Sequence, residues 1–442
     1  MKNVFVDFQN IVGKMKPMHA VNNGPVYDAD NLEQQIGNFE EYKALEIPFA
    51  RNHDASFCAQ YGGEHIVDIH LIYPDFDSDP YDESSYDFDL TDRYLKSTIA
   101  AGTKIFYRLG TKIEHTKKRY GTIPPKDFKK WAIICEHIIR HYNEGWNSGF
   151  NMNIEYWEIW NEPDGAPNWT GTPQQYYDLY NVASKHLKEQ FPHLKIGGPA
   201  LAFIDGKEWI DNFIDSIEVK PDFFSWHIYI SDNVNYFAET AEYVRKLMDD
   251  KGWYDTELII NEWNYVKSFQ TEEWKYSLKK MVSLKGASFV SAVMSVCQYS
   301  VLDMLMYYDA RPCAMNGLFS PYRYELLKGY YVFKMFSNLY KLGNCVNFKS
   351  DDDDIFGCAS TDGLKSAIML TYYNDSDDLK QKKLKINIKD SIDAEEICVK
   401  IYYLSESEDM NLRYEQIMTS DRYNLILTIN PHETIYIESV RG

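Results

Sequence analysis

The sequence is poor in positive charge and contains no long apolar run. It has 46 Lys and Arg against 66 Asp and Glu, for a formal net charge of −20. Because phosphate binding requires a concentrated basic surface, this balance argues against nucleic acid or an anionic membrane as partner and favours a neutral substrate. No segment approaches the ~20 apolar residues needed to cross a bilayer, and residues 1–5 lack the apolar run of a secretory signal. We therefore expect a cytoplasmic protein with no membrane partner.

Cysteine is scarce, and its spacing argues against disulfide and zinc frameworks. The seven cysteines are odd in number, widely separated and without a C-x-x-C pair, so they are predicted to be reduced core thiols: Cys58, Cys135, Cys297, Cys313, Cys345, Cys358 and Cys398. Two acidic stretches, residues 75–89 and 351–354, lack the ligand spacing and turn glycine of an EF-hand loop and are predicted to be solvated loops. We expect no metal site and no cofactor.

A long middle region alternates short apolar runs with helical patterns, which is typical of repeated βα units around a parallel sheet. The candidate strands are residues 47–51, 104–109, 154–161, 194–198, 222–229, 257–261 and 304–308, with an eighth near residues 10–13. The candidate helices are residues 32–43, 125–142, 173–190, 207–217, 237–250, 271–284 and 327–342. Eight such units predict an α/β fold, a closed (β/α)8 TIM barrel over residues 9–340, with its chemistry at the C-terminal strand ends.

The pattern changes after residue 342. Alternating segments separated by Asp- and Asn-rich turns follow, at residues 366–372, 383–388, 399–404 and 425–429. This spacing predicts a C-terminal β-sandwich domain over residues 341–442. A strand-like run at residues 4–8 makes residues 1–8 a candidate to join it.

Two predicted strands each end in a glutamate. Residues 157–164 read W-E-I-W-N-E-P-D, and residues 258–264 read L-I-I-N-E-W-N, which places Glu162 and Glu262 at two strand ends. The fourth and seventh strands lie on opposite sides of an eight-stranded barrel, so these carboxylates can face each other across a sugar-sized gap. Two facing glutamates form the minimum apparatus for cleaving a glycosidic bond, and we favour the retaining mechanism. Glu158, lower on the same face, is predicted to be a buried structural acid.

Polar neighbours support this interpretation. Asn161 precedes Glu162 and can donate an amide hydrogen bond to a sugar hydroxyl, or it can stabilise the turn. His227 and Tyr229 share one face of the sixth strand. The histidine can orient a carboxylate and the tyrosine hydroxyl can hold the nucleophile, although a single core histidine is often structural.

These residues together resemble glycoside hydrolase family 39, whose better-known members are β-xylosidases and α-L-iduronidases. The landmarks of the family occur in its order, at residues 124–128 (P-P-K-D-F), 157–163, 194–199 (L-K-I-G-G-P), 223–229 and 317–319 (G-L-F), and the resemblance covers roughly residues 45–340. It implies a (β/α)8 barrel with a family-like β-sandwich after it.

The resemblance also implies roles for individual residues. Glu162 is expected to be the general acid/base and Glu262 the nucleophile. His53, in the run Arg51-Asn52-His53, is a candidate ligand of the nonreducing sugar, and His227 and Tyr229 match the pair on the family's sixth strand. Trp263 is expected to form a wall near the anomeric carbon.

Two strands depart from the family pattern. Arg108 stands on the third strand where an acidic sugar-binding residue is expected, and Tyr308 and Asp309 lie in a run, residues 306–311, that departs from the usual Tyr-Trp. An arginine facing the pocket can favour an anionic sugar or pair with a local acid, for which Asp309 is a candidate. Arg108, Tyr308 and Asp309 therefore complete the set of expected substrate-binding residues.

The combined prediction is a retaining exo-glycosidase, most similar to β-xylosidases, acting on a small carbohydrate substrate. An α-L-arabinosidase, a β-glucosidase, a uronidase and an endo-acting glycanase are the alternatives within enzymes. The alternative from another class is a noncatalytic carbohydrate-binding barrel, which the presence of both glutamates disfavours. A homo-oligomer is left open, since no residue supports it.

Overall fold

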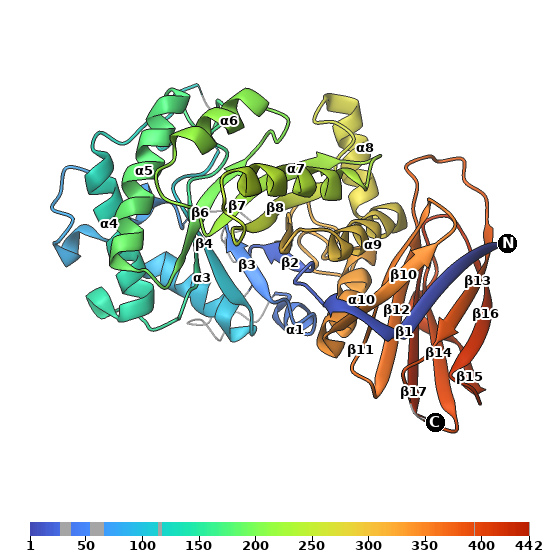
Figure 1. Ribbon diagram of the computed structural model, residues 1–442. Coiled ribbons are helices and arrows are strands. Elements are labelled where there is room, and N and C mark those ends of the chain that lie inside the picture. Colours follow the sequence, from blue (N-terminus) through green and yellow to red (C-terminus); the bar gives the residue numbers. More distant parts are fainter. Residues whose placement is uncertain (27–36, 54–65, 114–116, 393, 442) are drawn as a thin grey trace.

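The computed structural model describes residues 1–442 except residues 27–36, 54–65, 114–116, 393 and 442. Figure 1 shows a barrel surrounded by helices on one side and a separate, mostly antiparallel sheet on the other. This arrangement confirms the predicted fold class, a (β/α)8 barrel with a C-terminal β-sandwich.

Within the described residues, the barrel has eight parallel strands in chain order. It closes because the first strand pairs with both the second and the last. A ring of apolar side chains, which includes Phe106, Phe223 and Met306, fills its interior. The strands are β2 (Ala20–Asn22), β3 (Phe49–Asn52), β4 (Lys104–Leu109), β5 (Tyr156–Ile159), β6 (Lys195–Leu201), β7 (Phe223–Ile230), β8 (Glu257–Tyr265) and β9 (Met304–Tyr307).

Helices cover the outside of the barrel. Local sequence sets their ends: α5 (Pro173–Gln190) begins with a capping box between Thr172 and Gln175 and has proline in its first turn. The others are α1 (Phe39–Lys43), α2 (Ile69–Ile72), α3 (Asp89–Ala100), α4 (Phe128–Glu144), α6 (Lys207–Ser216), α7 (Tyr236–Asp250), α8 (Thr271–Met281), α9 (Leu284–Tyr299) and α10 (Lys328–Leu342), with short 3-10 turns at Glu83–Ser85 and Trp146–Ser148.

The helical predictions need correction in two ways: some bounds differ, and some helices were not predicted. The helix expected at residues 271–284 ends at Met281, and α9 follows it after a short break. Helix α9 was not predicted because it is buried on nearly every side and therefore has no amphipathic stripe. Helix α3 was also missed. Residues 32–36 of the helix expected at 32–43 lie outside the described residues, and α1 begins at Phe39.

The prediction of a barrel strand near residues 10–13 was wrong. These residues belong to β1 (Lys2–Lys14), which pairs antiparallel with β10 (Asn344–Ser350) and parallel with β13 (Lys382–Lys389). The alternating side chains of Val4, Val6 and Phe8 explain this placement, because they bury in the sandwich core. The first barrel strand is β2, whose three residues are too few to show a periodicity.

The sheet outside the barrel has the strand order β15-β14-β17-β12-β11-β10-β1-β13-β16. It folds over a single apolar core, so that the hydroxyl of Tyr403 in β14 donates to the carbonyl of Thr428 in β16 at 3.3 Å. The remaining strands are β11 (Ile355–Thr361), β12 (Lys365–Tyr372), β14 (Ile397–Leu404), β15 (Asp409–Met418), β16 (Arg422–Ile429) and β17 (Thr434–Arg441).

The loop after β12 connects the sandwich to the rim of the barrel. Asp375 accepts hydrogen bonds from the hydroxyl of Tyr265 at 2.6 Å and from that of Ser231 at 3.0 Å. Its carboxylate also lies 3.1 Å from the ammonium of Lys285, whose side chain is 3% exposed. Tyr265 ends β8 and Ser231 follows β7, so the loop contacts two strand ends of the barrel mouth.

Six cysteines are free thiols, as predicted: Cys135, Cys297, Cys313, Cys345, Cys358 and Cys398. Cys58 lies outside the described residues. Of the two acidic stretches, residues 351–354 are not simply solvated, because Asp352 and Asp354 pair with Lys382 at 2.5 and 2.7 Å.

No single helix in the described part of the chain is both long and apolar enough to cross a membrane. Helices α8 and α9 meet that length and composition together, but an 80° bend separates them.

We predict that Asp375→Ala lowers the free energy of unfolding by about 1–3 kcal/mol, because it leaves two buried hydroxyls and a buried ammonium without a shared acceptor. Denaturant unfolding monitored by circular dichroism measures the loss. Asp378→Ala, at an exposed position of the same loop, is the control and should change stability by less than about 0.5 kcal/mol. Equal stability of the two variants would contradict a structural role for the Asp375 contacts.

Candidate active site

Glu162 and Glu262 face each other at the C-terminal end of the barrel. Glu162 follows β5 and Glu262 lies in β8. One oxygen of each carboxylate and one ring nitrogen of His227 all lie within 4.8 Å of one another. The side chains of Glu162 and Glu262 are 16% and 7% exposed, so Glu162 is the more accessible of the two.

The backbone after β5 directs two consecutive polar residues to this mouth. Trp160 and Glu162 both have left-handed φ angles, 76° and 50°. This strained conformation ends the strand alternation, so Trp160 turns outward against Trp131 of α4 while the oxygen of Asn161 accepts from Arg51 inside the barrel. Unbroken strand alternation would put Trp160 on the face of Glu158 and Asn161 on the opposite face, so alternation does not hold at this strand end.

The close approach behind Trp160 requires a glycine. Gly110, after β4, has a φ of 123°, and a Cβ at this position would lie 3.0 Å from the Cα of Trp160. Either condition disfavours a side chain, and together they fix glycine here.

Each of the four carboxylate oxygens accepts one hydrogen bond from the protein. Glu262 accepts from the Arg51 guanidinium at 2.7 Å and from the Tyr229 hydroxyl at 2.8 Å. Glu162 accepts from the amide of Asn168 at 2.7 Å, and the Nδ1 atom of His227 lies 2.7 Å from its other oxygen. The geometry thus places His227 and Tyr229 beside the two glutamates, where the sequence analysis expected them.

Arg51 of β3 is the hub of the site. Its guanidinium donates to Glu158 at 2.7 Å, to Glu262 at 2.7 Å and to the side-chain oxygen of Asn161 at 2.6 Å. A further contact of 3.2 Å reaches the side-chain oxygen of Asn22 in β2. The planar fork of arginine suits this divergent set of acceptors, which a lysine ammonium does not match.

Glu158 lies beneath the mouth and is fully buried. Besides Arg51, it accepts from the hydroxyl of Ser225 at 2.6 Å and from the amide of Asn261 at 2.5 Å. The prediction that Glu158 is a buried structural acid with local partners is confirmed.

Aromatic rings continue the wall of the site from β7 and the end of β9. The ring of Tyr308 packs edge-on against His53 at 5.8 Å and against Tyr229 at 6.5 Å. The backbone N–H of His53 donates to Asn23 at 3.1 Å, which fixes the end of β3. Of the two residues expected to bind substrate, Tyr308 therefore lies beside Tyr229, the partner of Glu262, and His53 lies beside Tyr308.

Trp263 does not form a wall of the site, and that expectation was wrong. It is fully buried and packs edge-on against Phe237 of α7 at 5.6 Å and against Tyr307 at 5.4 Å. A bulge in β8 at Asn261 explains this: Asn261 and Glu262 both point into the barrel, so Trp263 points to the helices.

The contacts of Arg108 and Asp309 do not support the sugar-binding roles expected of them. Arg108 is fully buried, and its guanidinium donates to Asp68 at 2.6 Å. Asp309 is also fully buried and accepts from the backbone N–H of Arg311. The expected pairing of Arg108 with Asp309 was wrong, because Asp68, in the segment after β3, supplies the acid.

Arg51 was expected only as a neighbour of His53, and other polar residues of the site were not predicted: Asn22, which contacts Arg51, Asn168, which contacts Glu162, and Asn261 and Ser225, which contact Glu158. Asn261 directly precedes Glu262, as Asn161 precedes Glu162, and this repeated Asn-Glu pair was the available signal. The link from Asn168 depends on loop geometry that no periodicity encodes.

The spacing of Glu162, His227 and Glu262 also suits a divalent cation. Hydrogen bonds from protein donors, however, already account for the convergence of the two carboxylates. Arg51 supplies the positive charge at 2.7 Å from Glu262.

Burial and charge set the protonation of the surrounding donors. Burial alone would lower the pKa of His227, but the carboxylates of Glu262 and Glu162 outweigh it and raise that pKa above 6.5. Burial, reinforced by Glu262, raises the pKa of Tyr229 well above 10, so its hydroxyl keeps the proton that it donates. For Arg51, burial opposes the charge, yet Glu158 and Glu262 raise the pKa and keep the guanidinium ionised.

A (β/α)8 barrel that brings two glutamates this close at its C-terminal mouth has the architecture of the barrel-type glycoside hydrolases. The profile of the glycosyl hydrolases family 39 matches residues 50–281, more than half of the chain. The chain belongs to this family.

Sequence similarity to individual proteins is consistent with this family. Over 174 residues the chain is 29% identical to a β-xylosidase of Geobacillus stearothermophilus, covering 36% of this chain and 34% of that protein. Over 185 residues it is 26% identical to a β-xylosidase of Caldicellulosiruptor saccharolyticus, covering 39% and 36%. The match thus spans about a third of the length of these relatives.

Solved structures share the whole fold. A glucosidase from Croceicoccus marinus superposes with a TM-score of 0.81 at 20% identity, covering 100% of this chain and 99% of that one. A monomeric β-xylosidase from Caulobacter crescentus superposes with a TM-score of 0.72 at 16% identity, covering 100% of both chains.

We predict that Arg51→Met lowers the free energy of unfolding by about 3–5 kcal/mol, because it leaves two buried carboxylates without their counterion. Arg51→Lys keeps the charge and should cost less. Urea unfolding of both variants measures the difference, with Arg140→Lys in a partly exposed pair on α4 as the control. Equal losses for Met and Lys would show that the charge of Arg51 is not what stabilises the site.

We predict that the stability contributed by His227 depends on pH. Since its folded-state pKa is raised above 6.5, the contribution is fully present below that pH and is lost as the pH rises through the folded-state pKa. The difference in Tm between wild type and His227→Asn should therefore be largest in acid and shrink in alkali. Thermal unfolding across the pH range measures it, and His193→Asn at an exposed position is the control. A difference that grows with pH would contradict the prediction.

Proposed function

We propose that the protein is a retaining glycoside hydrolase in which Glu262 is the nucleophile and Glu162 the general acid/base. The observation that carries the proposal is the distance between the two carboxylates, whose nearest oxygens lie within 4.8 Å. Retaining enzymes separate their carboxyl groups by about 5–5.5 Å, whereas inverting enzymes need about 6.5–9.5 Å to admit a water molecule. The short distance supports double displacement.

The surroundings of each glutamate support the division of roles. Glu262 is the less exposed and is held by the cationic Arg51 and the hydroxyl of Tyr229, which suits an anion that must attack in a fixed direction. Glu162 is the more exposed, and an uncharged donor, Asn168, holds one of its oxygens. This side can reach the departing group first and water afterwards.

The reaction then follows in two steps. A carboxylate oxygen of Glu262 forms a bond to the anomeric carbon as the bond to the leaving oxygen breaks, and Glu162 gives that oxygen its proton. Glu162 next removes a proton from water, whose oxygen displaces Glu262 and restores the free enzyme. Because Arg51 binds the oxygen of Asn161, the amide N–H groups of Asn161 can donate to a sugar hydroxyl beside the reacting carbon.

We propose a β-xyloside as the first substrate to test, acted on from its nonreducing end. The two β-xylosidase relatives support this choice. A uronide is disfavoured as the substrate. The argument for it was an arginine that faces the pocket, but the guanidinium of Arg108 is buried against Asp68. Arabinoside and glucoside cleavage and endo action are the remaining enzymatic alternatives, and His53 and Tyr308 are the proposed contacts to the glycone.

The test is release of nitrophenol from a panel of aryl glycosides: β-xyloside, α-L-arabinofuranoside, α-L-arabinopyranoside, β-glucoside, β-galactoside, β-glucuronide and α-L-iduronide. Activity on one glycone is expected, with a loss of more than about 1,000-fold in Glu262→Ala. No nitrophenol release from any of these glycosides would instead favour a longer glycan as the substrate or a noncatalytic carbohydrate-binding barrel.

We predict that Glu162→Ala spares dinitrophenyl glycosides relative to alkyl glycosides, because good leaving groups need little protonation. Added azide should yield a glycosyl azide of retained configuration from this variant and of inverted configuration from Glu262→Ala. Proton NMR of the products distinguishes the two. Glu155→Ala, which changes a partly exposed glutamate paired with Lys195 before β5, is the control. Exchanged stereochemistry would reverse the assigned roles.

A further inference from the structure

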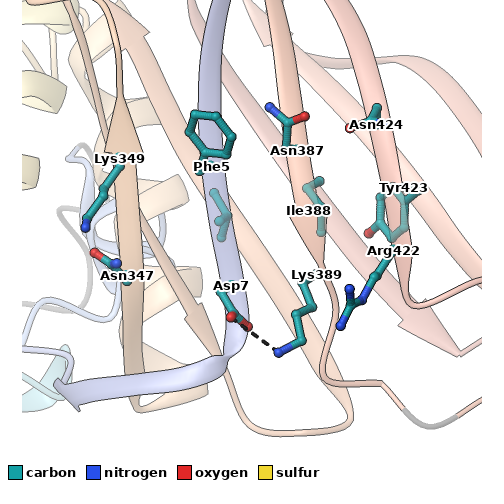
Figure 2. A pocket seen from close by; sticks show the side chains of 11 residues that line it. Phe5, Asp7, Asn347, Lys349, Asn387, Ile388, Lys389, Arg422, Tyr423 and Asn424 are labelled. Atoms are coloured by element: carbon teal, nitrogen blue, oxygen red, sulfur yellow. Dashed lines mark hydrogen bonds and ion pairs between the residues drawn. The ribbon is translucent and has the colours of Figure 1, made fainter.

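The outer face of one half of the sandwich carries a shallow depression of about 390 Å³. Figure 2 shows its side chains on the four adjacent strands β10, β1, β13 and β16. Strands β13 and β16 lie on the side of the sandwich away from the barrel (Figure 1), so this surface is separate from the active site. Its lining combines the exposed ring of Phe5, the largely buried Tyr423, several amides, several cations and one acid.

Strand register arranges these side chains in two parallel rows. The first row runs from Lys349 through Phe5 and Asn387 to Asn424, and the second from Asn347 through Asp7 and Lys389 to Arg422. Three strand spacings of about 4.8 Å make each row about 14 Å long, which is the size of a short oligosaccharide. Phe5, which is 52% exposed, offers a flat apolar surface between polar neighbours.

The charge of this face is opposite to that of the whole protein. The chain carries a formal charge of −20, but the outward positions of these strands hold five cations and a single acid, Asp7: Lys349, Lys383, Lys385, Lys389 and Arg422. Lys389 pairs with Asp7 at 3.4 Å. The other four cations have no ion-pair partner among the described residues, so their charge is available to a ligand.

We propose that this face is a second carbohydrate-binding site, selective for chains that contain uronic acids. The guanidinium of Arg422 and the ammonium of Lys349, at opposite ends of the two rows, bind carboxylates of the chain. The ring of Phe5 stacks on a sugar face, and Asn347 and Asn424 bond to hydroxyls. The choice of a glycan rests on the proposed glycosidase function, whereas the choice of an anionic one rests on the unpaired cations.

Two other occupants fit the face less well. The acidic surface of a second copy of this chain would complement the charge of this face. The amides and the single exposed ring, however, form a polar row instead of the apolar centre of a stable dimer. Nucleic acid would meet only this small basic face, while the rest of the protein repels phosphate.

The test is calorimetric titration of Glu262→Ala, which binds without cleaving, with a hexamer of galacturonic acid. We expect binding that weakens at least about tenfold when the salt is raised from about 50 to about 500 mM, since screening removes the attraction of exposed charges. The fully methyl-esterified hexamer, which has the same backbone without charge, should bind at least about tenfold more weakly. Equal binding of the two hexamers would overturn the proposal.

A variant pair locates the site. Lys349→Ala/Lys385→Ala/Arg422→Ala should abolish hexamer binding, while Lys129→Ala/Lys185→Ala/Lys279→Ala, which removes the same charge from exposed positions on the barrel helices, should retain it. The first triple variant should also keep wild-type activity on the small aryl glycoside, so failure of the binding proposal and failure of the proposed enzymatic function are separate outcomes. Loss of binding in both variants would show that the overall charge of the protein, and not this face, determines binding. If the wild type forms dimers and the first triple variant does not, the face would instead be a contact between two copies of the chain.

Discussion

The buried guanidinium of Arg51 is the interaction on which the site depends. Two carboxylates, Glu158 and Glu262, are removed from water inside the barrel, and each is costly unless paired. One arginine on β3 balances both and also holds the oxygen of Asn161. Three strands that are separated in the chain are thereby fixed to one another at the level where the reaction is proposed to occur. The same contacts fix the register of these strands and the orientation of Glu262, the proposed nucleophile.

The mouth is fixed from outside as well. Asp375 of the sandwich holds the hydroxyls of Tyr265 and Ser231, which end the strands that carry Glu262 and Tyr229. The β-sandwich therefore supports the ends of the two strands that carry Glu262, the proposed nucleophile, and its hydroxyl partner Tyr229. This contact gives a physical reason for the barrel and the sandwich to occur together, because a barrel without the loop would leave Lys285 buried without that carboxylate.

The sequence allowed much of this architecture to be predicted, and the failures have common causes. Strand β4 and helix α5 were predicted to the residue because their apolar patterns and end signals are strong. Both glutamates followed from polar residues at the ends of apolar strands. Periodicity failed where burial is complete, as in α9, and where a left-handed residue breaks alternation, as at Trp160. Strand alternation also predicts only the side of the sheet that a side chain faces, and not its contacts. It predicted that Arg108 faces inward but not that Asp68 is its partner.

The distribution of charge relates the two proposed carbohydrate sites. A protein with a net charge of −20 repels a polyuronate over most of its surface, so an anionic chain can approach closely only where unpaired cations gather. The sandwich face with Lys349 and Arg422 meets this condition, whereas at the barrel mouth Arg51 is already balanced by two carboxylates. The two proposals therefore assign charge recognition to the sandwich and bond cleavage to the barrel. A neutral glycone in the active site is compatible with an acidic glycan on the second surface, because the two proposed sites would bind different parts of one polymer.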